Sequence, residues 1–175
     1  KDLKFEVLSL KELGYSTEIE EPFDSFAENS AIKAKTIHQQ FKFNCISDDS
    51  GLCVDFLSGN PGVKTARYAG QNATNIQNME KLLYQMRNTT NRNAVFSTFI
   101  TLIFENKIKQ FEGNVKGIIS KKMIGNNGFG YDPVFIPEGS SKTFAEMNSE
   151  EKAKFSHRAK AMSKLKKYLK EKCLF

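Results

Sequence analysis

The sequence has no tryptophan, two histidines and three cysteines among its 175 residues. The cysteines, Cys45, Cys53 and Cys173, form no C-x-x-C pair, so a disulfide scaffold and a zinc finger are excluded and reduced thiols are expected. The longest mostly apolar run, residues 94–104, is shorter than the roughly 18 residues that a membrane span needs. The first residues, KDLKFEVLSL, do not form a signal peptide. We therefore expect a soluble cytoplasmic protein without a membrane partner.

Apolar bulk is nevertheless sufficient for a core. Hydrophobic residues make up 39% of the chain and include fifteen phenylalanines, which excludes a mainly disordered protein. The length suits one domain, because domains most often contain about 100–150 residues. No repeat, low-complexity tract or linker divides the chain, so we expect residues 1–175 to form a single domain.

The positive charge is concentrated near the C-terminus. Residues 152–172 contain nine Lys and Arg and one acid, a charge of +8, whereas the other 17 basic and 19 acidic residues give −2. Nucleic-acid binding through this segment is one interpretation. The lysines fall on the polar side of an amphipathic helix, however, and such a face is more often only solvated. We therefore expect no nucleic-acid partner.

Hydrophobic periodicity and turn residues predict an α/β or α+β domain with a mixed sheet. Ser25 and Glu28 form a capping box at the start of one predicted helix. The turn formers Asp48 to Gly51 are expected to separate two short strands. The predicted helices are residues 25–41, 74–87 and 156–172; the predicted strands are residues 5–10, 43–47, 52–57, 94–104 and 108–119, the last two forming a hairpin.

Two groups of polar residues are candidates for phosphate and metal chemistry. Asp48 and Asp49 follow an apolar strand, and carboxylates at a strand end suit Mg²⁺, although a plain surface turn has the same composition. Glu28 is a candidate ligand whose other interpretation is helix capping. Asn29 and Lys33 lie one helical turn apart and would face a common site or only solvent.

Two further motifs are candidates for binding a ligand, a base at the first and an anion or acceptor-rich ligand at the second. The glycine-rich loop from Gly125 to Pro133 offers the flat ring of Phe129, and it is neither a P-loop nor a dinucleotide fingerprint. His157 and Arg158 fall in the first turn of the last predicted helix, where an anion or an acceptor-rich ligand would offset their charge. An ordinary loop and an exposed first turn are the alternatives.

Together these motifs resemble a known family in order and wording. The blocks are SFAENSAIKAKTI, SDDSGLCVDFLSGNPGVKTARYAG, GNNGFGYDPVF and TFAEMNSEEKAKFSHRAKA. They are similar to the inosine/xanthosine triphosphate pyrophosphatases, the Ham1-like enzymes, over residues 25–169. The resemblance implies Mg²⁺-dependent hydrolysis of ITP, dITP and XTP to the monophosphate and pyrophosphate. It also implies an elongated mixed sheet flanked by helices, two lobes with a central cleft, and a homodimer.

The resemblance assigns roles to matching positions. Asp49 matches the catalytic acid and a metal ligand, and Glu28 and Asp48 match the metal site. Arg158, His157 and backbone N–H groups would donate to the 6-oxygen of hypoxanthine or xanthine and leave adenine's amino group unpaired. The predicted substrate-binding residues are Ser50, Asn29, Lys33, Phe129, Gly130, Tyr131, Asp132, Lys152, His157 and Arg158.

One family feature is missing from the sequence. The family begins with a strand and an S/T-x-N-x-x-K loop that holds the triphosphate, and we expect that roughly twenty residues carrying them are absent here. An alternative function is therefore a nucleotide-binding protein with impaired catalysis. A Maf-like pyrophosphatase is a second alternative, which the FGYDP and SHR blocks disfavour.

Overall fold

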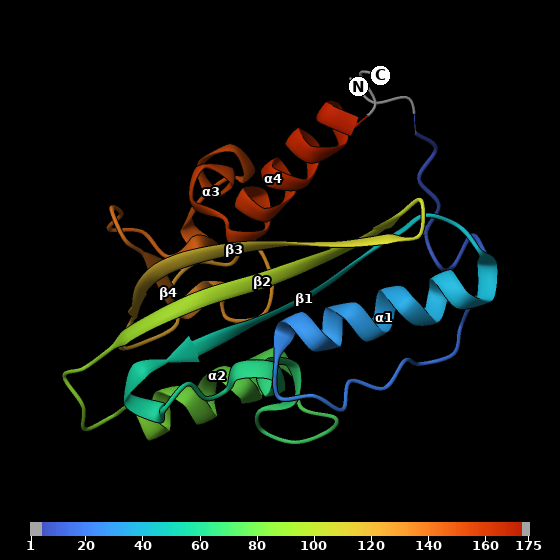
Figure 1. The fold of residues 1–175 in the computed structure, drawn as a ribbon. Coiled ribbons are helices and arrows are strands. Elements are labelled where there is room, and N and C mark those ends of the chain that lie inside the picture. The colour runs from blue at the N-terminus through green and yellow to red at the C-terminus, as the bar shows by residue number, and fades with distance from the viewer. Residues whose placement is uncertain (1–4, 173–175) are drawn as a thin grey trace.

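The computed structural model describes residues 5–172, so Cys173 lies outside the described residues (Figure 1). The chain combines helices and strands, which confirms the α+β class. Four short 3₁₀ helices, η1 to η4, span Asp55–Leu57, Gly62–Arg67, Asp132–Val134 and Phe144–Glu146. The main elements are α1 (Phe26–Phe41), β1 (Cys45–Val54), α2 (Asn75–Gln85), β2 (Asn93–Phe104), β3 (Lys107–Ile119), β4 (Phe135–Pro137), α3 (Ser149–Phe155) and α4 (His157–Lys172).

The sheet is antiparallel in the described part of the chain, where a mixed sheet was expected. Its order is β1-β2-β3-β4, and each strand pairs antiparallel with the next. The predicted hairpin is confirmed as β2 and β3, which are the two longest strands. The short turn between β2 and β3 permits only antiparallel pairing, whereas β1 and β2 pair antiparallel although η1, η2 and α2 separate them in the chain.

Strand β1 corrects the prediction of two short strands joined by a turn. It pairs with β2 without interruption from Cys45 opposite Ile103 to Val54 opposite Ala94. Asp48 and Asp49 therefore lie in the middle of a strand, and the pairing overrides the turn preference of their neighbours. Because successive side chains of a strand point to opposite faces, the two carboxylates lie on opposite faces of the sheet.

The predicted strand at residues 5–10 is wrong. The described part of this segment is irregular and leads into a turn at residues 10–14. Phe5 is 44% exposed and Val7 is 80% exposed, so the alternating apolar residues bury little surface. An alternating pattern forms a strand only where a neighbouring strand accepts its hydrogen bonds, and no such neighbour pairs with the described residues.

The helix ends follow the capping signals. The Ser25 side chain accepts a hydrogen bond from the N–H of Glu28 at the start of α1, and Thr74 forms a capping box with Gln77 at α2. The last helix begins at His157, as predicted. The preceding helix α3 was not predicted, because seven residues show little periodicity. No helix among residues 5–172 has both the length and the hydropathy to cross a membrane.

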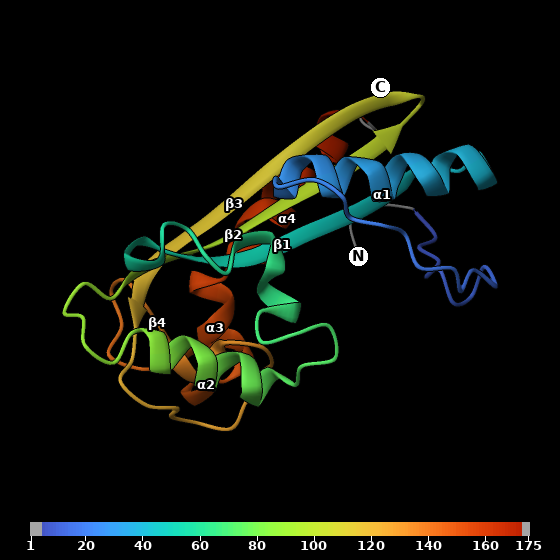
Figure 2. The same cartoon turned by 90° about the horizontal axis from the view of Figure 1, so that it is seen from below.

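Two hydrophobic clusters lie along the long hairpin. Helix α1 covers β1 and β2 on one face of the sheet, and α4 covers β2 and β3 on the other (Figure 2). Under α4, Ile100 and Phe111 pack against Ala161 and Leu165. The larger cluster lies at the other end of the hairpin, where β4 and α2 gather, and includes Leu52, Leu82, Phe96, Phe135 and Phe144.

Candidate active site

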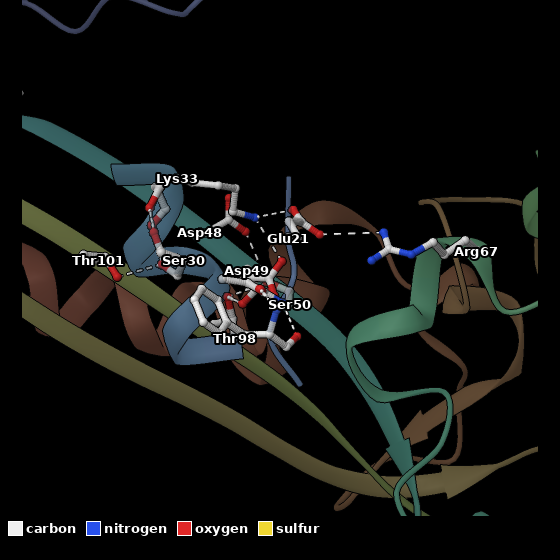
Figure 3. Close-up of polar contacts among 12 residues, drawn as sticks. Glu21, Ser30, Lys33, Asp48, Asp49, Ser50, Arg67, Thr98 and Thr101 are labelled. Atoms are coloured by element: carbon white, nitrogen blue, oxygen red, sulfur yellow. Dashed lines mark hydrogen bonds and ion pairs between the residues drawn. The ribbon is translucent and has the colours of Figure 1, made fainter. Parts of the chain in front are cut away.

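A lysine bridges two carboxylates on the α1 face of the sheet (Figure 3). The Lys33 ammonium lies 3.0 Å from Oδ1 of Asp49 in β1 and 2.9 Å from Oε1 of Glu21. The Asp49 side chain is 12% exposed, and those of Lys33 and Glu21 are 20% and 25% exposed. Arg67 of η2 lies 3.8 Å from the other oxygen of Glu21. The cluster thus holds two negative and two positive charges at the edge of the protein interior.

Burial sets the protonation of this cluster. The pKa of Asp49 is raised, chiefly because burial removes water from its carboxylate, and the charge of Glu21 adds to the rise. Hydrogen bonds from Lys33 and Asn29 lower the same pKa in part. Burial lowers the pKa of Lys33, but the two carboxylates outweigh it and the net shift is upward. Lys33 therefore stays positively charged at neutral pH.

Asn29 binds the backbone of the segment before α1, and its contact with substrate stays a prediction. It is fully buried, its side-chain amide donates to the carbonyl of Phe23 at 2.9 Å, and its Oδ1 accepts from the N–H of Phe23 at 3.0 Å. These two bonds fix the irregular segment before α1, which carries Glu21. Asn29 therefore holds the backbone segment that places Glu21 beside Asp49.

The second carboxylate near Asp49 is Glu21, whereas the sequence pointed to Glu28. Glu28 is exposed in the first turn of α1 and forms no ion pair with any described residue. Sequence periodicity could not reveal Glu21, because it belongs to an irregular segment. Its only sequence signal is its position in the acidic run Glu20-Glu21 before Pro22.

The carboxylates that the structure brings together differ from the predicted Mg²⁺ ligands. The structure places Asp48 and Asp49 on opposite sheet faces, so it does not assemble the predicted set of Glu28, Asp48 and Asp49, and no group of three or more His, Cys, Asp or Glu among residues 5–172 is arranged for a metal. Glu21 and Asp49 remain as a pair that already shares one cation. Mg²⁺ is commonly held by one or two carboxylates, with water and substrate phosphates completing the shell, so this pair fits the ion.

On the opposite face of the sheet, Asp48 connects β1 to α4. Its Oδ2 accepts from Nε of Arg158 at 3.1 Å and from Oγ of Ser50 at 3.1 Å. The hydroxyl of Ser50 also contacts that of Thr98 in β2. Ser50 and Arg158, both predicted to bind substrate, are thus brought together by Asp48.

The glycine-rich loop presents an aromatic ring between two cations. Phe129 is 61% exposed, and Nζ of Lys152 and Cζ of Arg158 lie 5.2 and 5.3 Å from its ring centroid. Asp132 is buried below the ring, where its Oδ2 accepts from the N–H of Phe129 at 2.8 Å and from Lys152. A Cβ at Gly128 would lie 2.0 Å from this oxygen, so the tight loop needs glycine there.

The other residues of this loop differ in their exposure. Tyr131 is 2% exposed and its hydroxyl donates to the carbonyl of Thr65 at 3.0 Å, so it supports the loop from below, and its contact with substrate stays a prediction. Thr65 in turn accepts from the N–H of Leu52 in β1 at 2.9 Å. Gly130 has open space around its Cβ position. The loop is therefore tied to the strand that carries Asp49.

His157 is buried at the start of α4. The residue is 8% exposed, and its ring stacks on Phe96, with centroids 4.8 Å apart and planes at 4°. Burial, helped by the charges of Arg158 and Lys152, lowers its pKa to about 4, so the ring is neutral. Its Nδ1 is buried and has no hydrogen-bond partner among the described residues. The helix lies this close to β3 because Gly113 has no side chain; a Cβ there would lie 2.1 Å from the His157 carbonyl.

These features suit a nucleotide site in an α+β protein: Glu21, Lys33 and Asp49 lie on one sheet face, and on the other Asp48 holds Arg158 near the exposed ring of Phe129. The chain belongs to the Ham1 family, whose model matches residues 1–168. It is 47% identical over 155 residues to the "dITP/XTP pyrophosphatase" of Flavobacterium psychrophilum, covering 89% of this chain and 82% of that protein. It is 46% identical over 172 residues to the protein of the same name from Caldanaerobacter subterraneus, covering 97% and 86%. The solved structure of the Staphylococcus aureus Ham1 protein matches with a TM-score of 0.91 at 38% identity, covering 95% of this chain and 88% of that one.

Proposed function

We propose that this chain hydrolyses the non-canonical purine nucleoside triphosphates ITP, dITP and XTP to the monophosphate and pyrophosphate. The names of the relatives support this activity. The observation that carries it is that the two neighbouring aspartates of β1 lie on opposite sheet faces and contact different groups. Asp49 joins a half-buried group of charges on one face, and the adjacent Asp48 holds Arg158 beside the exposed ring of Phe129 on the other. We therefore assign the surroundings of Asp49 to the triphosphate, as the phosphate end of the site, and the surroundings of Phe129 to the purine, as the base end.

At the phosphate end, Glu21 and Asp49 would hold Mg²⁺, which neutralises phosphate charge and orients water when bound. Asp49 is also our candidate for accepting a proton from the attacking water. Lys33 supplies a positive charge for the phosphate oxygens. Phosphoryl chemistry needs mainly positioning and electrostatic stabilisation, and this small group of charges provides both.

At the base end, Phe129 offers a face on which a purine stacks. His157 is neutral, and buried N–H groups without a partner are rarer than buried acceptors, so we assign its proton to Nε2. Nε2–H and the Arg158 guanidinium would then donate to the 6-oxygen of hypoxanthine or xanthine. Adenine presents an amino donor at this position, and leaving buried donors unpaired can reduce kcat/KM by about 10⁴-fold.

Pyrophosphate release from ITP, GTP and ATP, with Mg²⁺ and with EDTA, tests this proposal. We expect turnover of ITP that far exceeds turnover of GTP and ATP and that EDTA abolishes. Tight ITP binding without release would favour the alternative of a nucleotide-binding protein with impaired catalysis. Absence of both in the folded chain would contradict the proposal.

Assembly and location also belong to this proposal. We propose a homodimer, as the family resemblance implies, and a cytoplasmic location. Sedimentation of the purified chain tests the dimer. We propose no nucleic-acid partner, since Lys160 and Lys164 of α4 donate to the carbonyls of Asn114 and Glu112 in β3, at 3.1 and 2.7 Å. Part of the basic helix is therefore engaged with the protein itself.

A further inference from the structure

Lys33 lies where a cation would bind between Glu21 and Asp49. We propose that its ammonium is a built-in competitor of the divalent cation: it fills the place between the two carboxylates in the metal-free protein and must leave when the cation binds. The inference rests on the proposed function for the identity of the metal, and its test uses metal binding without nucleotide.

The distances support this exchange. The ammonium is 2.9 Å from Glu21 and 3.0 Å from Asp49, so it makes the two contacts through which these carboxylates would hold a metal ion. A divalent ion with bonds of about 2.0–2.1 Å to the same oxygens would lie within hydrogen-bond range of this ammonium. Two cations that close repel strongly in a half-buried site, so they do not share it.

The surroundings fix the positions of the two carboxylates, whereas the Lys33 side chain can adopt another conformation once its ion pairs break. Asn29 binds both backbone groups of Phe23 and thereby fixes the segment of Glu21. Below the cluster, Ser30 donates to Thr101 at 2.8 Å and locks α1 onto the sheet (Figure 3). Lys33 itself has a flexible four-carbon stem and a side chain that is 20% exposed, so its ammonium can leave toward solvent or a bound phosphate.

The two cations of the cluster differ in what they contact. Lys33 touches both carboxylates, whereas Arg67 lies 3.8 Å from Glu21 alone. Competition therefore predicts a large effect of Lys33 on metal affinity and a small one of Arg67. A general charge effect predicts similar contributions from both.

The experiment titrates the nucleotide-free full chain with Mn²⁺, followed by calorimetry and by electron paramagnetic resonance of the free ion. We expect Lys33→Gln to bind Mn²⁺ about tenfold more tightly than the wild-type chain, because the competitor is gone. Arg67→Gln should change the affinity by less than about threefold. Lys35→Gln, which removes the same charge from an exposed position of α1, is the matched control and should leave the affinity unchanged.

Equal or weaker Mn²⁺ binding by folded Lys33→Gln overturns the inference, as does an equal gain in Arg67→Gln. Thermal melting checks the fold, and Lys33→Met, which keeps the apolar stem, provides a second variant. The proposed function fails separately, if the wild-type chain releases no pyrophosphate from ITP. Tighter Mn²⁺ binding by the two Lys33 variants, without an equal gain in Arg67→Gln, would then still support the competition.

Discussion

Asp48 and Asp49 are neighbours in the chain but lie in different environments. The Asp49 side chain is 12% exposed and pairs with Lys33 of α1, whereas that of Asp48 is 45% exposed and pairs with Arg158 of α4. Burial raises the pKa of Asp49. The alternation of a β-strand thus divides one dipeptide between the two ends of the candidate site, so that each carboxylate has its own task.

The two sheet faces differ in the same way. Facing α1, Ser47 of β1 donates to the carbonyl of Ser30, and Ser30 donates to Thr101 of β2. Facing α4, Ile100 and Phe111 pack against apolar helix residues. Buried hydroxyls that bond one another fix the relative position of α1 and β1 through directional contacts. The cluster of Glu21, Lys33 and Asp49 is therefore built on the face with the more directional packing.

The largest expected effect comes from exchanging each aspartate for its isosteric amide. Asp49→Asn should lower kcat for ITP by about 10³-fold, because it removes both the proton acceptor and the charge that would bind a cation. Asp48→Asn should lower kcat by less than about tenfold, since this side chain acts through Arg158. Steady-state pyrophosphate release measures both variants.

Circular dichroism and thermal melting control for folding in both variants. Equal losses of kcat in folded Asp48→Asn and Asp49→Asn would contradict separate roles for the two sheet faces. A large loss of kcat in Asp49→Asn, without one in Asp48→Asn, would show that only the carboxylate of Asp49 takes part in the chemistry.

The regular elements were predictable because their signals are local. The Ser25 cap marks the start of α1, and alternating apolar residues with a short polar turn mark the hairpin. Strand β1 was not predictable as one element, because Asp48, Asp49 and Ser50 favour turns. Only their pairing with β2 holds this part of the backbone in an extended conformation. Local propensity gives way to tertiary context at such positions.

The site was predictable in its residue types but not in its geometry. The structure places Lys33 beside Asp49 and Arg158 beside Phe129, and their roles toward substrate stay predictions. Motif reasoning missed Glu21, because its position depends on a tertiary contact, the two hydrogen bonds of Asn29 to the backbone of Phe23. Polar residues in a motif look the same in sequence whether they are exposed or bond to the backbone, so the sequence did not show that Asn29 and Tyr131 are buried while Phe129 is exposed.

A second comparison concerns His157, on the Asp48 side of the sheet. Its folded pKa of about 4 lies below its ordinary value of 6.5, so the unfolded chain binds more protons between these values. The neutral ring therefore contributes stability above pH 6.5 that is lost as the pH falls toward 4. The loss is at most about 3 kcal/mol.

Urea unfolding of wild-type and His157→Gln chains at about pH 7.5 and about pH 4.5 measures this loss. The difference in unfolding free energy between the two chains should shift against the wild type by about 2–3 kcal/mol at the lower pH. Parallel pH dependences of the two chains would show that the histidine is not buried in its neutral form.

The smallest effect is expected from the exposed pair of Asp48 and Arg158. A double-mutant cycle with Asp48→Asn and Arg158→Gln should give a coupling of only about 0.2–1 kcal/mol in unfolding free energy, because both side chains are well hydrated. The same cycle measured on KM for ITP should show clear coupling, because Asp48 orients the guanidinium beside Phe129. Coupling in stability without coupling in KM would make the pair a structural link between β1 and α4. Coupling in KM without coupling in stability would assign Asp48 to the base end of the site, in contrast to Asp49 at the phosphate end.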